Sequence, residues 1–181
     1  MKILLLLPFL IFPNFISATT FETAFGIPIG GLLAYKIQSC AATSDQSKRI
    51  CWINSPRKKD GDLSGSVKYQ DFFNLPAWAI SAKFWISLNE VGEVDVLEAN
   101  EIEGNQEEVI ANSISLKFGY PSEKYSLGEG RMYEWRKSKL SIKMSCYSKC
   151  NVKFISSKLV EERESILNEI QKLEIKRPKT P

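Results

Sequence analysis

The sequence contains no histidine among its 181 residues. Histidine is the commonest general base near neutral pH, the usual partner of a catalytic serine or cysteine, and the commonest metal ligand. A serine–lysine arrangement is present at Ser55-Pro56-Arg57-Lys58, but it requires both side chains on one helical face, which Pro56 opposes. The sequence therefore predicts a protein that is not an enzyme and that carries no cofactor or metal.

Acidic residues are the remaining route to catalysis, and several of them cluster. Asp95, Glu98, Glu101 and Glu103 lie close together in the chain, and Glu101 and Glu103 would share one face of a strand. Catalysis by paired carboxylates needs two different environments, one of which raises a pKa. The local sequence does not mark one carboxylate as buried and another as exposed. A solvated strand end is therefore the preferred interpretation, and a carboxylate-dependent hydrolase is an alternative.

Long apolar runs are also missing, except at the N-terminus. Met1-Lys2 precede an apolar segment over 3–12, and Pro13-Asn14 end it. That segment is shorter than the ~20 residues that cross a bilayer, whereas its layout, with the small residue Ala18 further on, is typical of a secretion signal. We expect a signal peptide over residues 1–18, cleaved before Thr19, and an exported chain without a transmembrane anchor.

The basic residues of the chain only slightly outnumber its acidic residues, with 24 lysines and arginines against 21 aspartates and glutamates. The formal net charge is +3, and the basic clusters Arg57-Lys58-Lys59 and Lys176-Arg177 are short. Such a small excess does not predict nucleic-acid binding. The expected partner is instead another envelope or secreted protein.

The chain has four cysteines, Cys40, Cys51, Cys146 and Cys150. An even number of cysteines in an exported protein predicts disulfides. A four-thiolate zinc site is disfavoured because the paired C-x-x-C spacings are missing. Three connectivities are possible, and the hairpin described next favours Cys146 with Cys150 and Cys40 with Cys51.

The second half of the chain has the clearest pattern. Residues 106–118 carry apolar side chains four apart and end at a Gly-x-Pro signal, which predicts an amphipathic helix. Three antiparallel strands follow. Alternation predicts that Cys146 faces Cys150, Met144 faces Val152 and Ile142 faces Phe154, with a turn at Lys137-Ser138 that sets Trp135 opposite Leu140 and Tyr133 opposite Ile142. A second amphipathic helix over 158–174 is expected to pack on the apolar sheet face, and a coiled-coil partner is the alternative.

The first half is less clearly patterned. Strands are expected over 33–40 and 50–54, a polar and disordered loop over 56–66, and a strand from Ile80 to Leu88 that turns at 90–93 into a partner over 94–97. The predicted fold class is α+β, with antiparallel meanders and two amphipathic helices. The predicted organisation is a mainly β half over 19–103, a helix, meander and helix over 104–175, and a flexible tail over 176–181.

Two features predict a binding surface. Trp85 lies out of phase with Phe84 and Ile86, so it is either on a second packed face or exposed as a contact residue. The outward face of the C-terminal strands is expected to carry a strip of basic side chains, with Glu134 as the only acidic residue among them. Such a strip would bind an acidic protein, an anionic glycan or a lipid headgroup surface. The strip consists of Arg136, Lys139, Lys143 and Lys153. A simple solvated face is the alternative.

Two short motifs carry a resemblance. Phe25-Gly26-Ile27-Pro28-Ile29-Gly30 near the mature N-terminus and Lys117-Phe118-Gly119-Tyr120-Pro121 after the first helix share an F-G-x-P pattern, which raises the hypothesis of two related halves. With the signal peptide and the tryptophan-bearing strands, the chain resembles uncharacterised small exported proteins of Gram-negative bacteria. This resemblance implies the periplasm and brings no activity.

The sequence thus predicts an exported, non-catalytic envelope protein that works as a binding module. A secreted inhibitor or immunity-type protein that blocks a hydrolase is the alternative, since small disulfide frameworks suit that role.

Overall fold

The structure, a computed structural model, describes residues 22–33, 36–41, 50–69 and 75–175. The predicted signal peptide and its cleavage site, and the C-terminal tail over 176–181, lie outside the described residues. Neither α-helix of the described part is long and apolar enough to cross a membrane.

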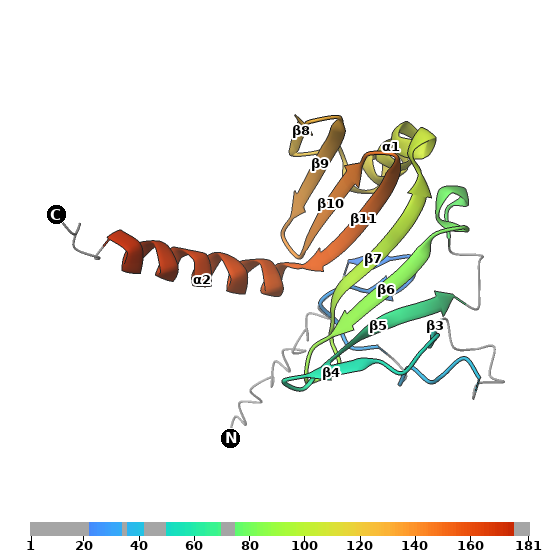
Figure 1. The fold of residues 1–181 in the computed structure, drawn as a ribbon, viewed down its shortest axis with the longest axis vertical. Helices are drawn as coiled ribbons and strands as arrows, with labels where there is room; N and C mark the ends of the chain where they lie inside the picture. The colour runs from blue at the N-terminus through green and yellow to red at the C-terminus, as the bar shows by residue number, and fades with distance from the viewer. Residues whose placement is uncertain (1–21, 34–35, 42–49, 70–74, 176–181) are drawn as a thin grey trace, which may run out of the picture.

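The described residues form one large antiparallel sheet that runs through both halves of the chain (Figure 1). Its strand order is β3-β5-β6-β7-β11-β10-β9-β8, and β4 pairs with β5 beside β3. The two sequence halves meet where β7 pairs with β11, so they share one sheet. The strands are β3 Ile50–Trp52, β4 Arg57–Lys59, β5 Asp62–Tyr69, β6 Lys83–Leu88, β7 Val94–Glu103, β8 Glu123–Leu127, β9 Gly130–Lys137, β10 Leu140–Cys146 and β11 Lys149–Ser156.

One face of this sheet, which we call the inner face, carries the hydrophobic core. Alternate side chains of the central strands point to it, for example Phe84, Ile86 and Leu88 on β6, as the alternation in the sequence predicts. The elements packed on it are the hairpin β1 Thr23–Ala24 and β2 Ile27–Pro28, the short 3-10 helix η1 Ala77–Ala79, and the helix α1 Glu107–Phe118. A second 3-10 helix, η2 Gly104–Gln106, precedes α1 and buries no residue. The fold is therefore α+β, as expected.

Helix α1 forms where the sequence predicts it. Its buried stripe is Ile110, Ile114 and Phe118. Two glutamates occupy its first turn, where the positive end of the helix dipole makes negative charges stabilising. The helix ends at Gly119, whose φ of 80° is a conformation that glycine adopts without strain. The Gly119 carbonyl accepts a hydrogen bond of 3.0 Å from Trp135 Nε1, which ties the helix end to β9.

The C-terminal meander confirms one predicted register and corrects another. Cys146 pairs with Cys150, Met144 with Val152 and Ile142 with Phe154, as predicted. Across β9 and β10, however, Ile142 faces Trp135 and Met144 faces Tyr133. The predicted register was off by two because the turn is formed by Ser138-Lys139 and not by Lys137-Ser138. A shift of two keeps every side chain on its predicted face.

Two predictions for the first half need correction, and the echo between the two halves is not confirmed. Residues 36–39 form no regular strand and meet β3 only through a bridge between Ser39 and Trp52. The segment expected as a disordered loop is the hairpin β4–β5, whose turn Asp60-Gly61 has both residues at positive φ; a D-G turn of this kind is a strong hairpin signal. The two F-G segments differ locally, because the first turns the β1–β2 hairpin and the second ends α1.

The second predicted helix is present, but it does not pack on the sheet. Helix α2, Ser157–Ile175, leaves the end of β11 and projects away from the sheet (Figure 1). Every side chain from Glu161 to Lys172 is exposed. The expected packing was wrong because the inner face is already filled by α1, η1 and the β1–β2 hairpin.

Candidate functional site

Both disulfides join the predicted pairs. Cys40–Cys51 links the segment before β3 to that strand, and Cys146–Cys150 closes the β10–β11 hairpin. All four cysteines of the chain are thereby used. No group of three or more potential metal-ligating side chains occurs within the described ranges.

The predicted binding residues lie on the face of the sheet opposite the core, which we call the outer face. One row of outer-face residues crosses seven strands in register, from Ser66 on β5 to Glu123 on β8. Its members are Ser66, Trp85, Glu98, Lys153, Lys143, Glu134 and Glu123. Trp85 is half-buried in this row, between Ser66 and Glu98. It is thus neither a core residue nor a freely exposed one.

The expected basic strip is neutralised by acidic neighbours. Lys153 Nζ lies 3.1 Å from Glu98 Oε1, and Lys143 Nζ lies 3.5 Å from Glu134 Oε1. Arg136 contacts Glu134 as well as Glu123 of β8. The prediction that only Glu134 opposes the strip was therefore wrong, because β7 and β8 flank the meander and each contributes a glutamate. Lys139 lies apart from the row, in the β9–β10 turn.

Glu134 is the centre of this charge network. Its side chain is nearly buried, which raises its pKa, but the hydrogen bond from Arg136 and the charge of Lys143 outweigh burial and hold the pKa of Glu134 below its ordinary value. The effect is mutual, because the hydrogen bond and the negative charge of Glu134 raise the pKa of Arg136. The network therefore fixes the outer face as a set of internal ion pairs, which leaves little net charge for an acidic partner.

The clustered carboxylates do not converge on one point. Asp95 accepts a hydrogen bond from Ser156 Oγ, Glu98 pairs with Lys153, and Glu101 pairs with Lys83 at 2.7 Å. Glu101 and Glu103 are both exposed. The described contacts of these residues thus do not place two of the carboxylates together, which hydrolysis by paired carboxylates requires.

An unpartnered apolar feature is the stripe on α2. Ile166, Leu167 and Ile170 are 51%, 60% and 46% exposed, and Ile166 and Ile170 lie one turn apart on one side of the helix. Leu159 lies about two turns before Ile166 on the same side of the helix, near the sheet, and is half-buried. We call Leu159, Ile166, Leu167 and Ile170 the α2 stripe. The sequence shows this stripe, but the crowded inner face that leaves it uncovered is a tertiary feature.

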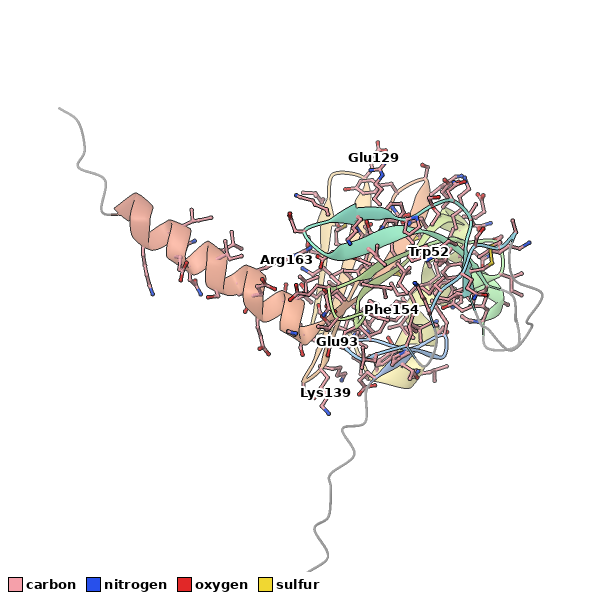
Figure 2. The ribbon with its side chains drawn as sticks, turned by 90° about the horizontal axis from the view of Figure 1, so that it is seen from below. Trp52, Glu93, Glu129, Lys139, Phe154 and Arg163 are labelled. Atoms are coloured by element: carbon pink, nitrogen blue, oxygen red, sulfur yellow. A yellow bond between two sulfur atoms is a disulfide. The ribbon has the colours of Figure 1, made fainter. Side chains whose placement is uncertain are left out.

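A groove of about 520 Å³ runs along the root of the α2 stripe. One wall is α2, with Leu159, Glu162, Arg163 and Ile166, and the other is the end of the sheet, where β6 turns into β7 and β4 into β5. The second wall presents Val91, which is 62% exposed, beside Glu90 and Asp62. Figure 2 shows α2 leaving the body of the protein with Arg163 near its root.

The root of α2 is held by polar contacts that the sequence reasoning missed. Ser156 caps the helix, because its Oγ accepts a hydrogen bond from the Leu159 N–H and the same hydroxyl donates to Asp95. Lys158 Nζ lies 3.4 Å from Glu93. Burial raises the pKa of Asp95, while hydrogen bonding to Asn89 lowers the pKa of Glu93. Ser156, immediately before the helix, was the available sequence signal.

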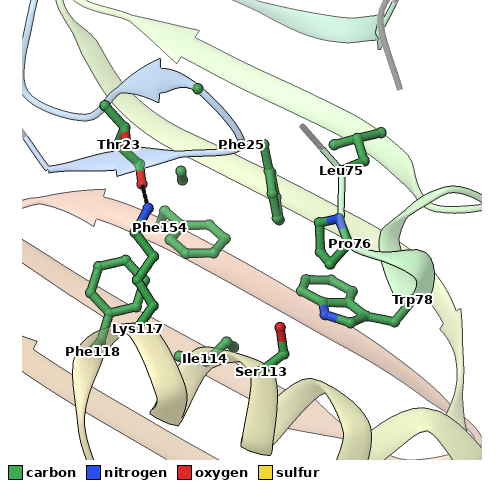
Figure 3. Close-up of a pocket in the computed structure, with 12 residues that line it drawn as sticks. Thr23, Phe25, Leu75, Pro76, Trp78, Ser113, Ile114, Lys117, Phe118 and Phe154 are labelled. Carbon is green, nitrogen blue, oxygen red and sulfur yellow. Dashed lines mark hydrogen bonds between the residues drawn. The ribbon is translucent and has the colours of Figure 1, made fainter. Parts of the chain in front are cut away.

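A second recess opens on the inner side, between α1, η1 and the β1–β2 hairpin (Figure 3). Its volume is about 420 Å³, and its walls are mainly aromatic and aliphatic. Lys117 Nζ donates a 2.6 Å hydrogen bond across it to the Thr23 carbonyl, and Phe25 packs edge-on against Trp78 and Phe154. The described lining residues include one charged group, Lys117, and no carboxylate. This recess has room for an apolar group but no set of catalytic side chains.

The chain was compared with protein-family models, with curated proteins and with solved structures, and none of the three comparisons found a match. The function must therefore be argued from the geometry.

Proposed function

We propose that the protein is an extracytoplasmic, non-catalytic binding module, and that it holds another envelope or secreted protein through the α2 stripe. The observation that carries this proposal is that every side chain of α2 from Glu161 to Lys172, the apolar ones included, is exposed. The periplasm is the compartment we propose, because two disulfides suit an oxidising compartment and the sequence begins with a signal-like segment.

An isolated helix of this kind is poorly stable without something to pack on. Isolated helices shorter than ~12–15 residues are marginal in water, and most helical stability in proteins comes from packing of the apolar face. Although α2 as a whole has 19 residues, its exposed part from Glu161 to Lys172 has 12. Exposed isoleucine and leucine side chains that line up along one side of a helix are the usual anchors of helix-mediated recognition. The α2 stripe has this arrangement, and its root is anchored to the sheet by Ser156 and Lys158.

The outer face and the inner recess support binding less well. The outer-face charges are satisfied by one another, so a partner would have to break existing ion pairs. The recess is lined by residues that already form the aromatic packing around Phe25.

Capture experiments with two matched variants test the proposal. We expect the purified, oxidised protein to retain partner proteins from an envelope extract, and the double variant Ile166→Asp/Ile170→Asp to lose them. The control is Leu116→Asp/Leu127→Asp, which adds the same charge at exposed apolar positions on α1 and β8. Retention of the same proteins by the α2 variant would contradict the proposal, provided that circular dichroism shows both variants folded.

The same experiment separates the inhibitor alternative. An inhibitor or immunity-type protein would capture one hydrolase and suppress its activity in the extract, whereas a structural or assembly module would capture its partner without such a loss.

A further inference from the structure

We propose that the partner segment held by the α2 stripe is a basic amphipathic helix, with lysine or arginine flanking its own apolar face. This inference rests on the proposed function and adds the chemistry of the partner. It reverses the polarity that the sequence suggested, since a basic strip would have recognised an acidic partner.

The first step is the course of the apolar surface, in which Arg163 lies between Leu159 and Ile166 on the same side of α2. Ile170 and Ile166 lie on the exposed part of α2, and Leu159 continues the same side into the groove, where Val91 forms the opposite wall. From Leu159 to Ile170 the helix rises ~16 Å, or about three turns. A helix that lies along α2 with its end in the groove would therefore cover the stripe and Val91 together.

The second step is the charge around that surface. The groove is lined by four acidic residues, Asp62, Glu90, Asp95 and Glu162, and by two basic ones, Lys158 and Arg163. Lys158 is already engaged by Glu93. Glu169 lies two turns beyond Glu162 on the same flank of the stripe and is exposed. The sheet wall of the groove is thus acidic, Glu162 and Arg163 offset each other on the α2 wall, and Glu169 adds a negative charge further along the helix. This acidic excess around the rim of the docking surface favours a basic partner.

The third step concerns a second copy of this chain, whose α2 is a poor match for the α2 stripe. If two α2 helices packed antiparallel about Ile166, Glu162 of one copy would face Glu169 of the other on the same flank. Like charges at flanking positions destabilise helix pairs, and opposite charges there select the partner. The α2 surface is therefore better matched to a helix of opposite flanking charge than to itself.

Two model peptides test the inference without knowledge of the natural partner. Both form about four helical turns with the same leucine stripe, and one is flanked by lysine and the other by glutamate. By fluorescence anisotropy with the purified, oxidised full-length mature protein, we expect the lysine peptide to bind about tenfold tighter at low salt. That preference should shrink as salt screens the exposed charges.

Variants of the rim sharpen the test. We expect Glu90→Gln/Glu162→Gln to weaken lysine-peptide binding about five- to tenfold, the effect of two exposed ion pairs. The charge-matched control Glu108→Gln/Glu129→Gln, at exposed sites on α1 and in the β8–β9 turn, should leave binding unchanged.

Several outcomes would overturn the inference. They are equal binding of the two peptides, tighter binding of the glutamate peptide, no binding of either, or sedimentation showing that the protein pairs with itself through α2. Any of these, combined with α2-dependent capture from the extract, leaves the proposed function intact while rejecting the basic helix. Loss of α2 dependence in the capture experiment rejects the proposed function itself.

Discussion

The exposure of α2 makes a quantitative prediction about stability. A buried isoleucine replaced by alanine costs about 2–5 kcal/mol, so packing of the stripe on the sheet, as the sequence suggested, would make the double variant Ile166→Ala/Ile170→Ala lose at least about 4 kcal/mol. In the structure, however, these two side chains are 51% and 46% exposed.

The expected effect is therefore small. Alanine has a helix propensity that is better than that of isoleucine by a few tenths of a kcal/mol, which offsets part of the lost contact. We expect the free energy of unfolding of the double variant to lie within about 1 kcal/mol of the parent.

Urea unfolding followed by tryptophan fluorescence measures this difference directly. The matched control is Ile142→Ala in β10, where the side chain is fully buried and a loss of about 3 kcal/mol is expected. A loss above about 2 kcal/mol in the α2 double variant would refute the reasoning, because it would mean that the stripe is packed in the folded protein.

Three further predictions concern the body of the fold. Glu107→Ala should lower the free energy of unfolding by about 2–3 kcal/mol, because it leaves the buried Tyr133 hydroxyl without the carboxylate 2.6 Å away; a urea midpoint equal to the parent's would contradict this. Glu134→Gln should destabilise the protein at neutral pH, because the lowered pKa of Glu134 means that its charged form stabilises the fold. In pH-dependent unfolding, the difference between variant and parent should vanish as the pH falls from the ordinary glutamate pKa through the lowered pKa of Glu134. Gly61→Ala should cost about 1–2 kcal/mol in thermal or urea unfolding, because φ is +96° and the new Cβ would lie 2.9 Å from Glu90 Cβ; unchanged stability would show that the β4–β5 turn relaxes freely.

The pairing of the C-terminal strands shows how far local pattern can reach. Alternation brought Cys146 opposite Cys150 and Met144 opposite Val152, because the side-chain period of a strand and the hairpin disulfide together leave one register. The neighbouring pairing was missed by two residues, since a shift of two satisfies the same alternation and only the turn geometry at Ser138-Lys139 distinguishes them. The D-G turn at Asp60-Gly61 was readable from the sequence and was overlooked.

The candidate site depended on information that no local pattern contains. The charges of Arg136, Lys143 and Lys153 could be placed on one face from the strand period, but their partners Glu98 and Glu123 come from strands whose position in the sheet follows from the whole topology. The same holds for the groove, because Val91 and Glu90 lie in a turn more than sixty residues before α2.

By itself, the sequence determined the α+β class, the cystine pairs, the core-facing residues of most strands and the amphipathic character of the last helix, because these depend on periodicity and spacing. Tertiary structure alone decided where that last helix goes. The inner face of the sheet has room for a limited set of elements, and α1, η1 and the β1–β2 hairpin occupy it. Helix α2 is therefore left projecting with its apolar stripe uncovered.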